Sequence, residues 1–507
     1  VLPDSVSSCS FRKLLISAGS FPLGTVSFIL SEIFYAWKED VSSKEQTIRS
    51  TCRICYNNCG VLIHLRDGQP VNISGDPDNP MNKGRLCPKG IASLEYLNHP
   101  DRLKHPLQRV GDRGQNRWRR ITWDQALDRV AENLNRVKAT YGVTSIVLLR
   151  GASKGLLDDH LARFGNALGT PNISSPAPYC FIPMAHGARF TYGFYSYPDF
   201  TYPPGCIVLW GSNPEATHFT DYEEILKARK AGTKLIVIDP LETKLARTAD
   251  LWLKPRPGTD LALALAWMRV MVTEGLYDPD FVAAWTVGFE RLKKHLQNYA
   301  PEQMAAVTWV PADQIKAAAR LYTSHRPACI GWGNGIETTI NSFQTCRAVA
   351  MLRALSGNLG VPGGEVKFSS PGGLDKGNAE FVLQDNIPAD VRSRRLSMQD
   401  GMMPIIYYAL PQTVMRAILD DEPYPVRAVY VHGGNPLTHY PHAAETRQAF
   451  EKLDFSVVAD MFMSPTAQMA DIVLPAASYL EADSVEQPWH YPIASVQQKV
   501  AQVGESW

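Results

Sequence analysis

The sequence predicts an α/β protein with a small cysteine-bound domain at its N-terminal end and two related α/β/α domains of the Rossmann type. Two observations lead to this expectation. Four cysteines gather within residues 52–87, and a pattern of apolar strand, loop, helix and strand occurs twice, at 206–253 and 428–475. Buried strands that alternate with helices form parallel sheets covered on both faces.

Length and composition are those of a globular protein with several domains. The chain has 507 residues, of which 45% are hydrophobic and 20% charged, and at about 100–200 residues per domain this allows three or four domains. The 51 basic and 50 acidic residues leave a net charge of +1. Nucleic-acid binding depends on neutralising phosphates with excess positive charge, so we expect no nucleic-acid partner.

The first residues are expected to form a leader. Residues 14–31 are an uncharged run that follows Arg12 and Lys13 and is interrupted by glycine and proline. A transmembrane helix needs about 20 apolar residues, so the run fits a twin-arginine-like export signal better, with an N-terminal anchor helix as the alternative. Such a signal predicts a periplasmic or extracytoplasmic location at the membrane; the alternative is cytoplasmic.

The cysteine cluster is the strongest motif. Cys52, Cys55, Cys59 and Cys87 have the spacing C-x2-C-x3-C-x27-C, and the last is followed by proline. Three thiols within eight residues must surround one centre, and a fourth completes a four-sulfur shell. Structural zinc sites usually pair two C-x2-C motifs, so the spacing favours a [4Fe–4S] cluster over zinc or unliganded thiols. Lys89 would bring a cation behind the cluster, unless it is a surface lysine.

The first copy of the repeated pattern has strands expected at 206–210 and 234–238, with a helix at 222–231 between them. An Ala-x-x-Ala-Asp motif follows at 246–250, seven residues after the acid that ends the second strand. The candidate binding residues lie at strand ends and in the loops after them: Gly211, Asn213, Asp239, Gly258, Thr259 and Asp260.

The second copy has strands expected at 428–431 and 455–458, with a helix at 443–453. Its Ala-x-x-Ala-Asp motif again begins seven residues after the acid at the strand end. The corresponding candidates are Gly434, Asn435 and Asp460.

Two matched loops predict two matched nucleotide sites. Parallel sheets bind ligands at the carboxyl ends of their strands, glycine lets backbone N–H groups approach phosphate, and a carboxylate accepts paired N–H bonds from a guanine edge. The ligand would have two nucleotide ends or bind as two copies. Neither loop is G-x-G-x-x-G, which disfavours a standard NAD site. Duplicated structural turns are the alternative.

These motifs together resemble the dimethyl-sulfoxide-reductase family of molybdopterin oxidoreductases. The likeness spans residues 49–500 and includes C-P-K-G at the fourth cysteine, G-S-N-P after the first strand and T-A-x-x-A-D-x-V-L-P near the end. The resemblance implies a [4Fe–4S] domain and two α/β/α molybdopterin-binding domains. They would hold molybdenum or tungsten between two molybdopterin guanine dinucleotides, one for each repeat.

The resemblance also assigns Cys180, which alone would be read as a small buried hydrophobe. Family members with a cysteine ligand have a glycine thirteen positions later, as Gly193 is here, so Cys180 is expected to bind the metal. Lys89 matches the family lysine between cluster and pterin. His186 and Arg189 are candidates for a proton donor and an anion clamp, or else ordinary polar residues of the helix.

Within the family the chain resembles polysulfide and thiosulfate reductase catalytic subunits and acetylene hydratase. Formate dehydrogenases have histidine directly after the ligand, where this chain has Phe181, and acetylene hydratase has aspartate after the second cluster cysteine, where this chain has Tyr56. We therefore expect a two-electron oxidoreductase of an inorganic sulfur compound. Formate dehydrogenase-like activity, acetylene hydratase-like activity and a non-catalytic electron relay are the alternatives.

The resemblance implies an iron–sulfur electron-transfer subunit and a membrane anchor subunit as partners. A C-terminal β-barrel domain is expected to be absent, since about 30 residues follow Pro475, from truncation or a split gene. The expected domains are a leader at 1–48, the [4Fe–4S] domain at 49–108, one α/β/α domain at 109–172 with 340–490, the other at 173–339, and a tail at 491–507.

Overall fold

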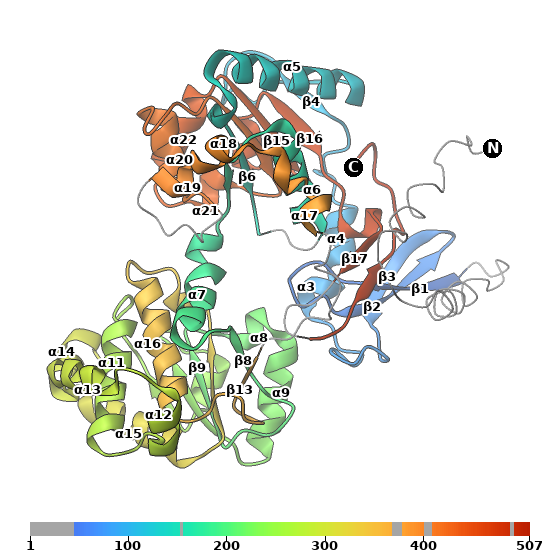
Figure 1. Cartoon of the computed structure of the whole chain (residues 1–507). Helices are drawn as coiled ribbons and strands as arrows, with labels where there is room; N and C mark the ends of the chain where they lie inside the picture. The colour runs from blue at the N-terminus through green and yellow to red at the C-terminus, as the bar shows by residue number, and fades with distance from the viewer. Residues whose placement is uncertain (1–44, 153–155, 368–377, 400–407, 487–490) are drawn as a thin grey trace, which may run out of the picture.

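The computed structural model describes residues 45–152, 156–367, 378–399, 408–486 and 491–507. The apolar run expected to belong to a leader lies outside these residues. In the part that is described, no helix combines the length and the apolar character needed to cross a bilayer. Figure 1 shows two α/β halves, one above the other, with a smaller β-rich domain beside them.

The smaller domain is a three-stranded antiparallel sheet with two short helices. Its elements are β1 (Glu45–Thr51), β2 (Gly60–Arg66), β3 (Gln69–Gly75), α3 (Pro88–Ile91) and α4 (Ser93–Leu97). Alternate residues of β2, Val61 and Ile63, are fully buried because successive strand residues face opposite sides of the sheet. Cys52 and Leu97 complete this core.

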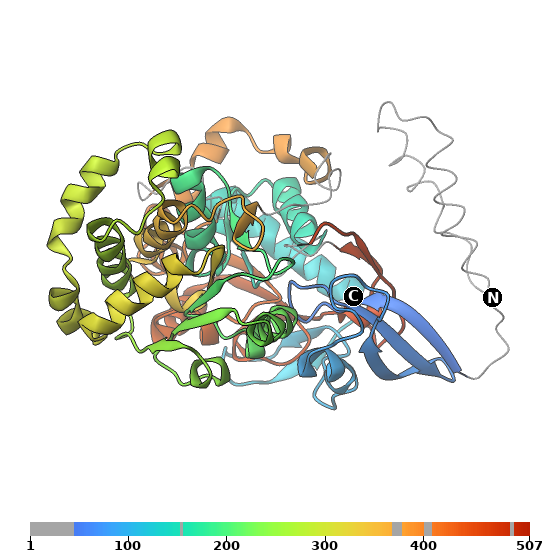
Figure 2. The same cartoon turned by 90° about the horizontal axis from the view of Figure 1, so that it is seen from below.

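The C-terminal segment returns to the small domain. β17 (Ser484–Glu486) pairs with β18 (Ser495–Gln497), and the Thr51 hydroxyl donates to the carbonyl of Val496 at 3.2 Å. Leu480 and Val503 pack in the core of this domain. The segment expected only as a tail therefore forms part of a folded domain (Figure 2).

One half contains a seven-stranded sheet in the order β5-β4-β16-β15-β14-β6-β7. The strands are β4 (Leu107–Arg109), β5 (Trp118–Arg120), β6 (Ile146–Arg150), β7 (Ile173–Ser174), β14 (Ala428–His432), β15 (Phe455–Asp460) and β16 (Ile472–Pro475). The run from β16 to β7 is parallel, and β4 and β5 are antiparallel additions at one edge.

Helices cover both faces of this sheet. α5 (Trp123–Tyr141) packs on one face, whereas α20 (Pro411–Leu419) and α22 (Ala443–Lys452) pack on the other (Figure 1). Thr122 is the N-cap of α5. Its side chain and that of Gln125 form a reciprocal capping box that satisfies free N–H groups at the start of the helix. The other α-helices of this half are α6 (Leu156–Leu168), α17 (Asn378–Phe381), α18 (Ala389–Ser393), α19 (Leu396–Gln399), α21 (Pro436–His439) and α23 (Pro465–Gln468).

The other half contains a parallel four-stranded sheet in the order β11-β10-β9-β12. Its strands are β9 (Cys206–Trp210), β10 (Lys234–Ile238), β11 (Leu251–Leu253) and β12 (Ala328–Trp332). In β9, Ile207 and Leu209 face one helical layer, while Val208 and Trp210 face the other. Burial on both faces explains why this strand is apolar throughout.

The helices of this half form those two layers. One layer consists of α9 (Phe219–Lys230) and α10 (Lys244–Arg247). The other includes α7 (Phe181–Tyr192), α11 (Asp260–Thr273), α15 (Ala312–Ser324) and α16 (Ser342–Leu355). The remaining elements are α8 (Pro214–Thr217), α12 (Pro279–Trp285), α13 (Phe289–His295), α14 (Pro301–Thr308), β8 (Ser196–Pro198) and β13 (Glu365–Lys367).

The predicted strands and helices of both repeats are present with bounds that differ by three residues at most. The division between the halves differs from the expected one. α16 contributes Cys346 and Val349 to the core of the four-stranded half, and β13 pairs with β8, so residues 342–367 lie with that half. β7 instead pairs with β6. The apolar face of α16 indicates burial but does not reveal which sheet buries it.

Candidate functional site

The four cysteines of the C-x2-C-x3-C-x27-C motif lie around one loop. The N–H of Cys52 donates to the carbonyl of Cys59 at 2.9 Å, which closes the loop, and Cys87 is the N-cap of α3. Burial, together with the charges of Cys55 and Cys87, raises the pKa of Cys52 to about 12. The same causes raise the pKa of Cys59. The four thiols are therefore close enough to interact.

A buried set of four thiols fits an iron–sulfur cluster. Thiols with raised pKa values give up their protons when a positive centre binds them, and four thiolates are the usual donors to [4Fe–4S]. In such a cluster each thiolate binds a different iron atom, so the four sulfurs need not converge on one point. Among the described residues, no three His, Cys, Asp or Glu side chains are arranged as ligands of a single metal ion.

The cluster domain contacts the helices that follow the first glycine loop. Lys89 Nζ donates to the carbonyl of Ala216 in α8 at 2.7 Å. The Tyr56 ring packs on that of His218, with 5.0 Å between centroids. Lys89 thus reaches from the cluster domain to α8, the helix that follows the first glycine loop; its place between cluster and pterin and its part in electron transfer stay predictions.

The first glycine loop follows β9 and lies against the residues after β12. The N–H of Gly333 donates to the carbonyl of Trp210 at 3.0 Å. Gly211 has φ +57°, and a Cβ added to Gly333 would lie 2.4 Å from the Gly211 carbonyl oxygen. Only glycine allows this approach of two backbones. Asn213 caps α8, and its Oδ1 is buried without a hydrogen-bond partner among the described residues.

The other residues predicted for this site lie at the same end of the sheet. Asp239 Oδ1 accepts the N–H of Leu241 at 2.8 Å, and Asp260 Oδ1 accepts the indole N–H of Trp210, also at 2.8 Å. Burial raises the pKa of both carboxyls, and the charge of Asp239 further raises that of Asp260. Thr259 donates to a backbone carbonyl, at 2.6 Å. Gly258, with φ +83°, is the third residue of this turn, which the N–H of Thr259 closes by donating to the carbonyl of Arg256 at 3.1 Å.

The second glycine loop has the same construction in the seven-stranded sheet. The N–H of Gly151 donates to the carbonyl of His432 at 3.0 Å, and Gly433 has φ +55°. A Cβ on Gly151 would lie 1.9 Å from the Gly433 carbonyl oxygen. Gly433 is thus the equivalent of Gly211, and the predicted Gly434 corresponds to Ser212.

The acceptors of the second loop are more occupied than those of the first. Asn435 caps α21, and its Oδ1 accepts the hydroxyl of Thr466 at 2.7 Å. Asp460 Oδ1 accepts the N–H of Met461 at 2.7 Å, and its Oδ2 accepts the hydroxyl of Ser464 at 2.8 Å. The two sites share their backbone framework and differ in the side-chain atoms left for a ligand.

The glycines after β6 and β12 were not predicted. Gly151 and Gly333 each follow an apolar strand directly, and that position was their only signal in the sequence. Two cradles that admit only glycine fit a pair of phosphate-containing ligands. The Asn213 Oδ1, without a partner among the described residues, fits a hydrogen-bond donor elsewhere on such a ligand.

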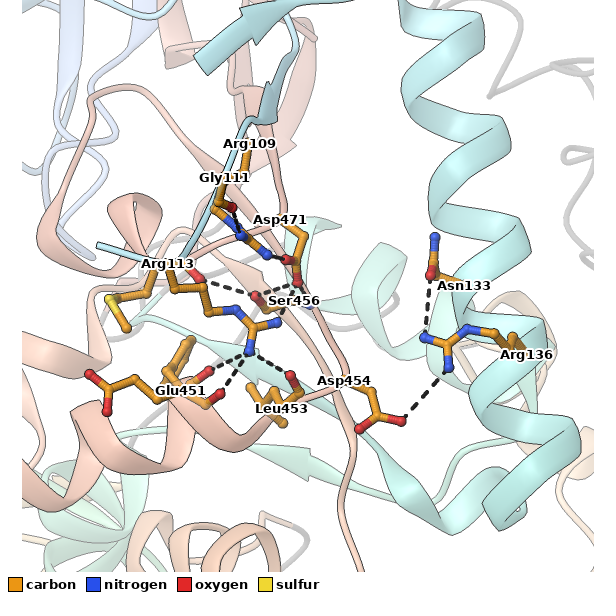
Figure 3. Close-up of polar contacts among 12 residues, drawn as sticks. Arg109, Gly111, Arg113, Asn133, Arg136, Glu451, Leu453, Asp454, Ser456 and Asp471 are labelled. Carbon is orange, nitrogen blue, oxygen red and sulfur yellow. Dashed lines mark hydrogen bonds and ion pairs between the residues drawn. The ribbon is translucent and has the colours of Figure 1, made fainter. Parts of the chain in front are cut away.

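The aspartates of the Ala-x-x-Ala-Asp motifs lie at the opposite ends of the sheets. Figure 3 shows Asp471 accepting the N–H of Ser456, at 2.7 Å, and pairing with Arg109 and with Arg113, the latter at 2.6 Å. Ser456 is near the start of β15. Asp471 therefore joins neighbouring strands and belongs to the framework.

Asp250 does the same in the first copy. Its Oδ2 accepts the N–H of Leu235, near the start of β10, at 2.9 Å, and it pairs with Arg229 and Lys234. This part of the repeated sequence is thus explained by strand packing rather than by ligand binding.

Cys180 directly precedes α7, the helix that lies between the two halves in Figure 1. The hydroxyl of Tyr179 bonds to Gln412 in α20 of the seven-stranded half. Cys180 itself is the N-cap of α7, and its Sγ is 3.5 Å from Nδ2 of Asn334, which follows β12. A thiol at this junction is half-buried and suits a soft metal ion.

His186 and Arg189 lie further along α7. At about 100° per residue they project roughly 120° and 180° around the helix from Cys180, so helix geometry does not favour a shared site. Burial lowers the pKa of His186, and the positive charge of Arg189 lowers it further. Their roles stay predictions.

Comparison with known proteins identifies the family of the chain. Residues 45–99 match the molybdopterin oxidoreductase Fe4S4 domain, and residues 102–506 match the molybdopterin oxidoreductase family. The chain is 32% identical over 498 residues to acetylene hydratase of Syntrophotalea acetylenica, covering 91% of this chain and 67% of that protein. It is 29% identical over 483 residues to the thiosulfate reductase molybdopterin-containing subunit PhsA of Salmonella typhimurium, covering 92% and 63%.

A third relative is formate dehydrogenase H of Escherichia coli, 30% identical over 461 residues, covering 86% of this chain and 63% of that protein. The solved structure of acetylene hydratase from Pelobacter acetylenicus superposes with a TM-score of 0.78 at 30% identity, covering 90% of this chain and 67% of that one. The chain spans about two thirds of the length of these relatives. It belongs to the molybdopterin oxidoreductases of the dimethyl-sulfoxide-reductase family and is an enzyme with an Fe4S4 domain and a molybdopterin domain.

Proposed function

We propose that the chain catalyses the two-electron reduction or oxidation of a small inorganic sulfur compound, such as polysulfide or thiosulfate. The metal would be molybdenum or tungsten, held by Cys180 and by two molybdopterin guanine dinucleotides. When bound, this group supplies reversible two-electron redox chemistry, and the [4Fe–4S] cluster supplies single-electron transfer.

One arrangement supports the proposal most directly: two glycine loops of the same construction, one in each half, with Cys180 at the passage between the halves. The N–H groups of Gly211 and Gly433 are bonded to the carbonyls of Ile238 and Ala459, so N–H groups offered to phosphates would come from the residues that follow them in each loop. Asn213 would use its buried Oδ1 to accept a donor from the ligand. Cys180 would contribute a thiolate to the metal.

Electrons would leave or enter through the cluster domain. Lys89 reaches from α3 to α8, so its cation would lie on the path between cluster and first dinucleotide and would favour extra negative charge there. His186 and Arg189 are proposed as a proton donor and an anion clamp for a substrate that reaches the side of α7 on which they lie.

The choice of sulfur chemistry rests on two residues and one relative. Phe181 follows the ligand where the family resemblance places histidine for formate oxidation. Tyr56 stands where that resemblance places an aspartate for acetylene hydration, and its ring is packed against His218. The relative that supports sulfur chemistry is the one named as a thiosulfate reductase subunit, at 29% identity. A non-catalytic electron relay is the remaining alternative, and the retained Cys180 and paired loops speak against it.

An iron–sulfur electron-transfer subunit and a membrane anchor subunit are proposed as partners, with export to the periplasmic or extracytoplasmic side as the proposed location. These proposals extend the family resemblance and the basic residues before the apolar N-terminal run.

The test uses the full-length protein produced anaerobically with molybdate or tungstate. Metal analysis comes first, and iron without molybdenum or tungsten would establish the relay instead. Oxidation of a reduced dye is then measured with polysulfide, thiosulfate, tetrathionate, arsenate and nitrate, and reduction of an oxidised dye with formate. Turnover with a sulfur compound is the expected result, and turnover with formate alone would overturn the proposal.

A further inference from the structure

We propose that Asn334 is a positioning residue for Cys180, whose side-chain amide donates a hydrogen bond to the thiolate and thereby tunes the bond from sulfur to the metal. This inference rests on the proposed function, because it takes Cys180 as the metal ligand. It adds a residue from β12 and its following turn, more than 150 positions away in the chain.

The amide of Asn334 presents both of its polar atoms to the sulfur. Nδ2 lies 3.5 Å from Cys180 Sγ, and Oδ1 lies 3.8 Å from it. A neutral thiol can donate to Oδ1, whereas a thiolate has no proton and can only accept from the N–H groups of Nδ2. Once Cys180 is a metal ligand the second arrangement applies, and a bond to a charged acceptor is the stronger one.

The backbone at Asn334 is held firmly. The carbonyl of Asn334 accepts the N–H of Glu337 at 3.0 Å and the hydroxyl of Thr338, also at 3.0 Å. The preceding residue, Gly333, is bonded to the carbonyl of Trp210. An amide on such a turn loses little freedom when it bonds to the sulfur, which favours a specific role over an incidental surface contact.

The same turn also holds the helix that begins at Cys180. Glu337 is 1% exposed, and its Oε1 accepts the N–H of Met184 in the first turn of α7 at 3.2 Å. The turn at 333–337 therefore contacts α7 at two points, at the sulfur through Asn334 and at the backbone through Glu337.

Two contacts from one turn set the position of the sulfur relative to the amide. The turn also packs on the first glycine loop through Gly335, whose N–H donates to the carbonyl of Gly211 at 3.3 Å. Movement of that loop on binding a dinucleotide would thus be passed to the residues around Cys180. Hydrogen bonds to a ligand sulfur withdraw electron density from the metal and raise its reduction potential.

The test compares holoenzymes loaded with molybdenum. Asn334→Ala removes the donor, and Asn334→Asp replaces it with a carboxylate of the same shape. Both are expected to shift the reduction potential of the metal to more negative values, the aspartate variant further, and to change its electron-paramagnetic g values. Asn334→Gln keeps an amide donor, so we expect its reduction potential to lie closer to that of the wild type than the potential of Asn334→Ala. Metal content and the signal of the [4Fe–4S] cluster are expected to remain those of the wild type.

Asn341→Ala is the matched control, because Asn341 is exposed at the start of α16 and caps it without a side-chain bond. Cys180→Ser separates this inference from the proposed function. If Cys180→Ser alters the metal signal and the Asn334 variants do not, the role of Asn334 is wrong. If Cys180→Ser leaves the signal unchanged, the ligand assignment itself fails. Loss of metal in Asn334→Ala and Asn334→Gln alike would show a purely structural role and also overturn the inference.

Discussion

Arg353 and Glu365 form an ion pair in which both side chains are fully buried, with 3.0 Å between Nε and Oε1. Glu365 Oε1 also accepts the N–H of Ile330 at 2.7 Å, and Arg353 donates to the carbonyl of the same residue. The guanidinium lies over the ring of Trp332, 3.9 Å from its centroid. The pair therefore binds both the N–H and the carbonyl of Ile330 in β12. This residue lies shortly before the turn that contacts Cys180.

Removing one partner of this pair should be costly. We expect Glu365→Gln to lower the free energy of unfolding by about 3–5 kcal/mol, because the buried charge of Arg353 loses its counter-ion. Chemical denaturation followed by tryptophan fluorescence measures the change, since Trp332 lies beside the pair. Glu290→Gln is the control, as its ion pair with Lys293 is exposed and should contribute less than about 1 kcal/mol. Equal losses in both variants would contradict the prediction.

The buried carboxyl of Glu337 should make stability depend on pH. Burial raises the pKa of Glu337 to about 8 in the folded protein, whereas an unfolded chain has a glutamate pKa of about 4.3. Between these values the folded state binds one proton more than the unfolded state, so this group makes the free energy of unfolding fall as pH rises. Burial keeps the nearby Tyr195 and Cys346 neutral by raising their pKa values.

We therefore expect Glu337→Gln to weaken the decline in melting temperature between pH 5 and 8 that this carboxyl causes. At pH 8 the variant should be more stable than the wild type, which must either hold a proton or bury a charge. Thermal unfolding across this pH range is the measurement, with Glu290→Gln as an exposed control. Identical pH profiles for wild type and Glu337→Gln would show that the carboxyl does not titrate in this window.

Loss of one cluster cysteine should remove the cluster. Cys59→Ala leaves three thiols, and we expect most of the protein-bound iron and the visible absorption of the cluster to be lost. Cys206→Ala is the control, because Cys206 is buried in the core of the four-stranded half and lies outside the motif. Iron retained by Cys59→Ala, at wild-type content, would mean that this thiol is not a ligand.

The glycine cradles should tolerate no side chain. Gly151→Ala would place a Cβ 1.9 Å from the carbonyl oxygen of Gly433, so the two strand ends must separate and the second loop must shift. We expect the purified variant to retain several-fold less molybdopterin, measured by the fluorescence of its oxidised product. Gly232→Ala has φ +98° with open space around the added atom and so controls for backbone strain alone. A similar cofactor loss in both would argue against a specific cradle.

Local patterns in the sequence revealed most of the framework. The apolar strands at Cys206–Trp210 and Lys234–Ile238 have their predicted bounds, because strands buried on both faces are apolar runs between turn residues. The glycine loop with Asn213 was recognisable for the same reason, since loop residues directly follow the strand. Cys180 became a candidate only through the family resemblance.

Features that depend on strand order could not be predicted in this way. Gly333 meets Gly211 because β12 lies beside β9, and Gly151 meets Gly433 because β6 lies beside β14. Sequence periodicity shows that a strand is buried but not which strand is its neighbour. For the same reason the sequence did not predict the contact of Asn334 with Cys180 or the packing of α16 with the four-stranded half.

The return of the C-terminal segment to the cluster domain has a consequence for biosynthesis. Thr51 and Val496, which bond across this interface, are 445 residues apart, and Leu480 and Val503 belong to the same core as Cys52. A ribosome delivers these residues only after it has made both α/β halves. The cluster domain can therefore close around its iron only after the ribosome has made residues 480–503, so cofactor insertion is coupled to the order in which the chain is made.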